Sequence, residues 1–192
     1  MQIRYEMGLS VEEYIEQREW EKVTLDRCPL HPEGGCRFAR LGTYERVHPS
    51  GVLIARWYCP DGHMTFSLLP DCLCSHLPGT LQEVEDVVFK AESFPSIAAA
   101  AKEDTRFIEP AGAWRWLERR IFLVEYALKM LIYYMPEMFS GCKPTISSFR
   151  SFLGTDSVLP LLRQMAAAYL HLLPYPLGFS TKSARQQSTG FY

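Results

Sequence analysis

The apolar positions between residues 38 and 67 follow a spacing that predicts β-structure. Apolar and aromatic side chains recur over residues 38–47 and lead into a His-Pro-Ser-Gly turn at 48–51. The run over 52–58 is rich in β-branched and aromatic residues, and Thr-Phe-Ser at 65–67 is typical of a further short strand. We therefore expect a small sheet of three strands.

From residue 78 onward the apolar positions recur every three or four residues, which predicts amphipathic helices. Thr80 and Ser96 are placed to cap two of them, and the second of these helices is short and rich in alanine. A long helix is expected over 113–134, with its apolar positions at Trp114, Leu117, Ile121, Val124, Leu128, Leu131 and Met135. Further helices are expected after residue 145 and over 158–173. Residues 180–192 are predicted to be a disordered tail.

The N-terminal segment, residues 1–27, is the most acidic part of the chain. Ser10 and Glu13 have the spacing of a capping box, which predicts a helix over 11–21. We interpret this helix as solvated on one side and packed through its aromatic side chains on the other. The alternative is a contact surface for a basic partner or for a second copy of the chain.

The composition is ordinary for a soluble globular chain of one large or two small domains. The 192 residues are 47% hydrophobic and carry a formal net charge of -2, so any nucleic-acid contact must depend on local basic patches. Neither a signal peptide nor an apolar run of about 18 residues is present, and we expect a cytoplasmic protein without a membrane span. In that setting six cysteines favour metal binding over disulfides.

Two clusters of soft metal ligands lie at the two ends of the predicted hairpin. The candidates are Cys28, His31, Cys36, Cys59 and His63. We predict that Cys28, Cys36, Cys59 and His63 hold a structural Zn²⁺, with His31 as the reserve ligand or as a group that orients a ligand. Four protein ligands leave no position for a catalytic water. The alternative is that these are buried structural thiols and incidental histidines.

A further cluster contains Cys72, Cys74 and His76. The two cysteines are too close for a zinc-ribbon knuckle, and no matching pair lies nearby in the sequence. We expect these residues to belong to the core or the surface, with a second metal site as the alternative.

The segment from Arg56 to Ser67, Arg-Trp-Tyr-Cys-Pro-Asp-Gly-His-Met-Thr-Phe-Ser, resembles the second knuckle of the zinc ribbons that open many bacterial insertion-sequence transposases. Those modules carry an Arg-aromatic-Cys-Pro segment followed by Thr-Phe-Ser, and the similarity covers about residues 28–70. Gly62 stands where the commonest pattern has a fourth cysteine, and His63 is shifted by one position. In that family the ribbon precedes a helix-turn-helix and assists DNA binding, and the resemblance implies the same role here.

These patterns together predict an α+β chain that is mostly helical. Its segments are an N-terminal helical segment (1–27), a three-stranded zinc ribbon (28–77), a helix-turn-helix-like domain (78–179) and the tail (180–192). The phosphate-binding glycine loops, His-Glu-x-x-His and Gly-x-Ser-x-Gly are absent from the sequence. The residues after the helices are too few for the acidic catalytic domain of the resembled transposases, so we expect no enzyme activity.

The preferred hypothesis is a DNA-binding regulator, or the targeting subunit of a mobile-element or recombination system. Arginines on the ribbon and at the start of the long helix are the expected DNA contacts. They are Arg37, Arg40, Arg46, Arg56, Arg115, Arg119 and Arg120. The alternative is a zinc-stapled adaptor that binds a protein partner, or a second copy of the chain, through the long apolar helix.

Overall fold

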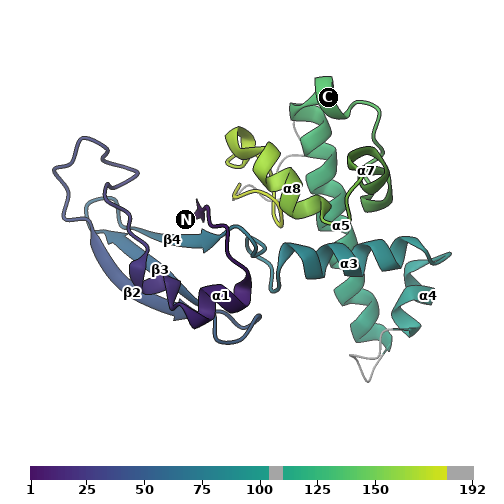
Figure 1. Cartoon of the computed structure of the whole chain (residues 1–192), viewed down its shortest axis with the longest axis horizontal. Coiled ribbons are helices and arrows are strands. Elements are labelled where there is room, and N and C mark those ends of the chain that lie inside the picture. Colours follow the sequence, from purple (N-terminus) through teal and green to yellow (C-terminus); the bar gives the residue numbers. More distant parts are fainter. Residues whose placement is uncertain (104–109, 181–192) are drawn as a thin grey trace. The chain divides into compact units, whose positions relative to one another are not determined.

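The computed structural model describes residues 1–103 and 110–180, and the chain divides into two compact units (Figure 1). The first unit is Met1–Leu73, and the second begins at Cys74. In the described residues there are eight α-helices and one four-stranded mixed sheet, so the fold class is α+β. The sequence predicts a loop over 104–110, of which the described structure includes only Pro110, the first residue of the long helix. All of the predicted tail over 180–192 except its first residue lies outside the described residues.

Three of the four strands are those that the sequence predicts. Strands β2 (Ala39–Glu45), β3 (Leu53–Cys59) and β4 (Met64–Pro70) form an antiparallel meander, with Trp57 opposite Phe66. The register of β2 against β3 shifts between Arg40 and Gly42. The ribbon-like hairpin is therefore present, and its third strand extends to Pro70.

The fourth strand, β1 (Gln2–Tyr5), corrects the prediction of a three-stranded sheet. It pairs in parallel with β4 at the edge of the sheet, in the order β1-β4-β3-β2. A bidentate ion pair fixes it, because Nε and Nη2 of Arg4 donate to the two carboxylate oxygens of Asp71 at 2.7 and 2.8 Å. The N-terminal segment is thus part of the sheet of the first unit.

The predicted N-terminal helix is present as two short helices, α1 (Val11–Glu16) and α2 (Glu19–Lys22). The capping box at Ser10 and Glu13 forms as expected. Arg18 has a left-handed backbone with φ of 50°, which ends the first helix and redirects the chain. Tyr14 and Trp20 are buried, and the Tyr14 hydroxyl donates to the Leu53 carbonyl at 2.9 Å, so the aromatic side does pack on the sheet unit.

The second unit is helical in the described residues. Thr80 and Ser96 cap helices as predicted, and the long helix spans the expected residues. The helix expected over 158–173 is shorter, since it ends at Met165 and a 3-10 turn (Ala167–Tyr169) follows. The helices are α3 (Leu81–Glu92), α4 (Ile97–Lys102), α5 (Pro110–Tyr134), α6 (Pro136–Phe139), α7 (Ile146–Leu153) and α8 (Val158–Met165). No helix in the described ranges is long and apolar enough to cross a membrane.

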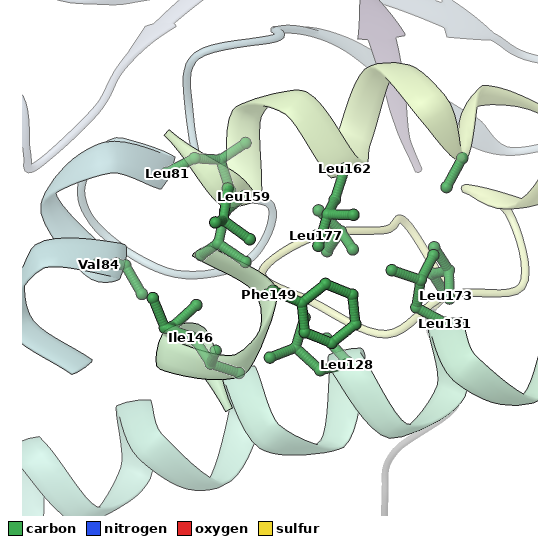
Figure 2. Packing of buried hydrophobic residues seen from close by; sticks show 14 of the residues in the cluster. Leu81, Val84, Leu128, Leu131, Ile146, Phe149, Leu159, Leu162, Leu173 and Leu177 are labelled. Atoms are coloured by element: carbon green, nitrogen blue, oxygen red, sulfur yellow. The ribbon is translucent and has the colours of Figure 1, made fainter. Parts of the chain in front are cut away.

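The core of the second unit lies between α3, α5, α7 and α8. Figure 2 shows apolar side chains of these helices meeting around Phe149, and Leu173 and Leu177 extend the core beyond α8. Leu128 and Leu131 of α5 are fully buried, as the three- and four-residue spacing predicts.

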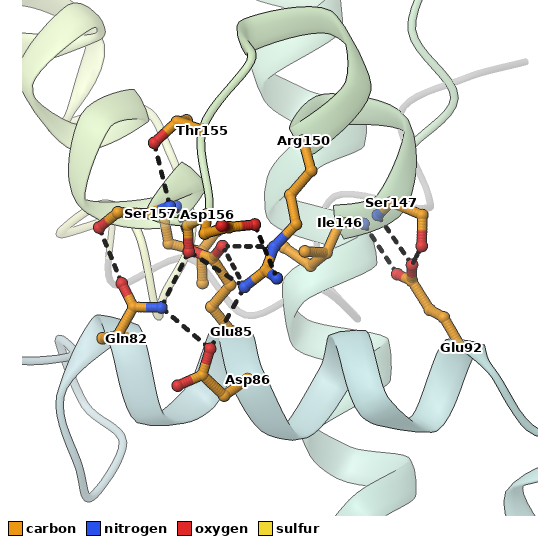
Figure 3. A network of polar contacts seen from close by, with 11 residues as sticks. Gln82, Glu85, Asp86, Glu92, Ile146, Ser147, Arg150, Thr155, Asp156 and Ser157 are labelled. Atoms are coloured by element: carbon orange, nitrogen blue, oxygen red, sulfur yellow. Dashed lines mark hydrogen bonds and ion pairs between the residues drawn. The ribbon is translucent and has the colours of Figure 1, made fainter.

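A polar network on α3 holds the starts of α7 and α8 (Figure 3). Both carboxylate oxygens of Glu92 accept backbone N–H groups of α7, from Ile146 at 2.7 Å and Ser147 at 2.8 Å. Glu85 is fully buried and accepts the backbone N–H of Leu159 in α8 at 2.8 Å. Its other oxygen accepts Nε of Arg150 at 3.0 Å. A carboxylate at a helix N-terminus satisfies otherwise unpaired amide groups, so α3 caps two later helices.

Candidate metal centre

Four potential metal ligands gather at one end of the first unit. They are Cys28, His31, Cys36 and Cys59, and their ligand atoms all lie within 4.8 Å of one another. Nδ1 of His31 is 3.5 Å from Sγ of Cys28 and 3.4 Å from Sγ of Cys59. Tetrahedral zinc with bonds of about 2.3 Å to sulfur and about 2.0 Å to nitrogen places these atom types about 3.5 Å apart. This Cys3His group can therefore hold a metal ion.

The loop from Cys28 to Cys36 supplies three of the four ligands. The His31 N–H donates to the Cys28 carbonyl at 3.1 Å, and the Gly34 N–H donates to the His31 carbonyl at 3.0 Å. Gly34 and Gly35 both have φ near +90°, at 88° and 86°, which favours glycine. The two consecutive turns bring Cys36 back beside Cys28, so one loop presents three ligands to the same point.

Cys59 is the last residue of β3 and comes to the group from the sheet. It is fully buried, and its register partner on β4 is Met64. Its Sγ accepts the backbone N–H of Gly62 at 3.3 Å. An N–H donor to sulfur stabilises the thiolate form that binds metals. The hairpin between β3 and β4 thus holds the fourth ligand in place.

The histidine of the group is His31, and this corrects the predicted choice of His63. His63 lies on the same turn as Cys59, but its side chain is exposed and does not belong to the group. Its backbone is left-handed, with φ of 46°. The side chain one position earlier would be directed at the cluster, since a Cβ built on Gly62 lies 3.5 Å from Sγ of Cys59 and 3.8 Å from Cε1 of His31. The shift of His63 by one residue therefore takes it out of reach.

The pKa values of the Cys28 and Cys36 thiols are shifted in opposite directions. Burial alone would raise the pKa of Cys28, but hydrogen bonds from the His31 side chain and from the backbone of Leu30 and His31 outweigh it and lower the pKa to about 7. Burial, together with hydrogen bonds to Cys28 and Cys59, raises the pKa of Cys36 to about 11. Three adjacent thiols cannot all ionise easily without a cation, and a bound divalent metal would supply it.

The cluster of Cys72, Cys74 and His76 does not join this group. Cys74 is fully buried in the hydrophobic core of the second unit, and its thiol donates to the Thr80 carbonyl at 3.2 Å. Cys72 is half-buried and His76 is exposed. Their surroundings agree with the expectation of core and surface positions.

The structure separates the predicted DNA-contacting arginines into two sets. Arg37, Arg40, Arg115 and Arg119 are exposed. Arg40 nevertheless binds the protein itself, as do Arg46, Arg56 and Arg120. On the ribbon, the Arg40 guanidinium donates to the backbone carbonyls of Trp20 and of Glu21, at 3.1 Å from the latter.

Arg46 and Arg56 are half-buried on the ribbon, and Arg120 is buried on α5. Nε of Arg46 donates to the His48 carbonyl at 3.4 Å. The Arg56 guanidinium lies 5.4 Å from the centre of the Tyr44 ring, and that of Arg120 lies 3.5 Å from the centre of a Trp116 ring. The i, i+4 spacing of Trp116 and Arg120 on a predicted helix favours their contact, whereas the contact of Arg56 with Tyr44 depends on strand pairing.

Comparison with protein-family models, with curated proteins and with solved structures found no match. The chemistry of the site is therefore inferred from its own side chains. The sequence contained one signal that favours His31, since Cys-x-x-His followed by Gly-Gly can place three ligands on one loop.

The two histidines give a direct test of the ligand set. His31→Ala is expected to weaken the binding of Zn²⁺ by at least 10-fold, because it removes one of four ligands, whereas His63→Ala should leave affinity within about 2-fold. Both can be followed by competition with a chromophoric chelator and by the d–d spectrum of the Co²⁺-loaded protein. Equal losses in the two variants would show that His63 takes part in binding.

Proposed function

We propose that this chain is a non-catalytic DNA-binding protein whose first unit is held in shape by a structural Zn²⁺. The observation that carries the proposal is the Cys3His group, which brings a long loop and the end of β3 to one point. All four ligands come from the protein, which is the arrangement of structural rather than catalytic zinc.

The donor set favours zinc over other divalent ions. Three thiolates and one imidazole are soft or borderline ligands, whereas Mg²⁺ and Ca²⁺ require oxygen. Cys28, Cys36 and Cys59 are free cysteines, so their thiols are available for a metal. The proposed role of the ion is to stabilise the fold, since it would tie the loop from Cys28 to Cys36 to the end of β3 at Cys59.

The exposed arginines support DNA as the partner. Arg37 directly follows the ligand Cys36, while Arg115 and Arg119 lie one turn apart in the first part of α5. Helix α4 packs on α5, with Ala100 and Leu117 in one buried cluster, and its small side chains permit close approach of the two helices. This helix pair is compatible with a helix-turn-helix in which α5 faces the duplex. The resemblance to transposase zinc ribbons implies the same partner.

The proposal predicts zinc-dependent binding of duplex DNA that weakens with salt. We expect the zinc-loaded full chain to shift duplex DNA at about 50 mM salt, where electrostatic affinity is highest, and to release it as salt rises. Arg37→Gln should weaken binding. Arg18→Gln is the matched control, because Arg18 is also exposed but pairs with Glu21 at 2.5 Å. Absence of a shift at low salt with the zinc-loaded protein would contradict the proposal.

A second candidate function, a protein-binding adaptor, is favoured by aromatic side chains on the outside of α5. Phe122 is 54% exposed and Tyr133 is 60% exposed. Phe122 also stacks on Tyr126, with ring centres 6.3 Å apart. Exposed aromatic residues are typical of protein interfaces, including homodimers. Two results would support the adaptor over the DNA-binding function. The wild-type chain would form a stable protein complex that Phe122→Ser abolishes, and it would not bind DNA.

A further inference from the structure

A basic pocket lies in the second unit, between α5 and the segment that precedes α3. Its volume is about 410 Å³. The described residues that line it are Leu77, Pro78, Arg115, Trp116, Arg119 and Arg120. None of these described lining residues is acidic, and three of the six carry a positive charge.

The charges of this pocket do not serve the stability of the helix. Arg115 and Arg119 are at positions i and i+4, where like charges repel on one helix face. Both side chains are exposed, so their guanidinium groups can reach a ligand at the pocket mouth. An anion held between them would relieve the repulsion.

The floor of the pocket is built and rigid. Arg120 is only 7% exposed, and its guanidinium lies 3.5 Å from the centre of a Trp116 ring. Nη1 of Arg120 also donates to the Trp116 carbonyl at 3.4 Å. The stacked pair brings a third guanidinium group to the lining of the pocket. The buried Leu77 and Pro78 give the lining an apolar part.

We propose that this pocket binds a phosphate group, held by Arg115 and Arg119 over the Arg120–Trp116 pair. Guanidinium groups match phosphate oxygens in geometry and charge, and a wall of Leu77 and Pro78 suits the apolar part of a nucleotide sugar. The phosphate could come from the DNA backbone or from a free phosphorylated molecule. If the phosphate belongs to DNA, this inference rests on the proposed function, and the pocket is the place where α5 would hold the DNA backbone.

The first arm of the test uses a small anion without DNA. Inorganic pyrophosphate is titrated into the zinc-loaded, ¹⁵N-labelled full chain, against sodium chloride at equal ionic strength. We expect saturable shifts of the amide signals of residues 115–120 and of the arginine Nε–H signals. In Arg115→Gln/Arg119→Gln the affinity should fall at least 10-fold, while Arg18→Gln leaves it unchanged. Unchanged circular dichroism establishes that the double variant is folded.

The second arm measures how DNA affinity depends on salt. Each phosphate contact contributes about 0.9 to the slope of log K against log salt, and the two arginines hold one phosphate, so the double variant should lower the slope by about 0.9. If DNA binds with the same slope in the double variant, the pocket does not hold the backbone. If pyrophosphate then also produces no specific shifts, the inference is overturned while the proposed function stands. If pyrophosphate binds but DNA does not, the pocket takes a free phosphorylated molecule and the DNA-binding function fails.

Discussion

Removal of the metal is expected to unfold the first unit and to leave the second unit folded. The binding free energy of a structural zinc is on the order of 10 kcal/mol and counts as folding free energy when the unfolded chain has no site. The loop from Cys28 to Cys36 joins the sheet at Cys59 through the ligand group, and without an ion three adjacent thiols remain. The second unit has its own core of buried leucines and aromatics.

The measurement is an amide NMR spectrum of the full chain before and after a strong zinc chelator. Signals of β2, β3 and β4 should collapse to random-coil positions, whereas those of α3 and α5 should stay. Cys59→Ser should have the same effect as the chelator. Cys142→Ser is the matched control, because Cys142 is a half-buried cysteine of the second unit and lies outside the ligand group. Retention of the strand signals after complete removal of the metal would contradict the prediction.

Local sequence signals were sufficient where the structure depends on near neighbours. The capping box at Ser10, the caps at Thr80 and Ser96, and the extent of α5 all follow from spacing within a few residues. Strands β2 to β4 are also predictable, because short turns connect them and their residues favour strands.

Long-range contacts explain most of what the sequence did not reveal. Strand β1 has only four residues, and it is fixed by pairing with β4 and by the ion pair between Arg4 and Asp71. No periodicity within the segment can reveal partners that lie more than sixty residues away, as the separation of 67 between Arg4 and Asp71 illustrates.

The candidate metal site illustrates a different limit. Cys28, Cys36 and Cys59 lie in one cluster, and residue type and hairpin layout suffice to propose such a cluster. The choice between His31 and His63 depends on the direction of the backbone at each residue. His63 has a left-handed backbone, and the spacing of residues in the sequence does not encode this. A shift of one position on a tight turn changes the direction of the side chain completely.

Glu85→Ala is expected to destabilise the second unit by about 3–5 kcal/mol. Glu85 is fully buried, and its carboxylate accepts both the Arg150 guanidinium and the backbone N–H of Leu159. Truncation leaves the mostly buried Arg150 with only the exposed carboxylates of Asp86 and Asp156. It also leaves the amide of Leu159 without an acceptor, and the two losses together have a cost of this size. The change can be measured as a shift of the urea midpoint of the second unit, followed by helical circular dichroism of the zinc-loaded chain.

Asp86→Ala provides the matched control, because Asp86 pairs with the same arginine at 3.2 Å from a side chain that is 60% exposed. A solvated ion pair contributes at most about 1 kcal/mol, so this variant should unfold close to the wild type. Double replacement Glu85→Gln/Arg150→Met removes both buried charges and should recover part of the loss caused by Glu85→Ala. Equal destabilisation by Asp86→Ala and Glu85→Ala would mean that the exposed and the buried carboxylates hold α7 and α8 equally, and the capping role assigned to Glu85 would be wrong.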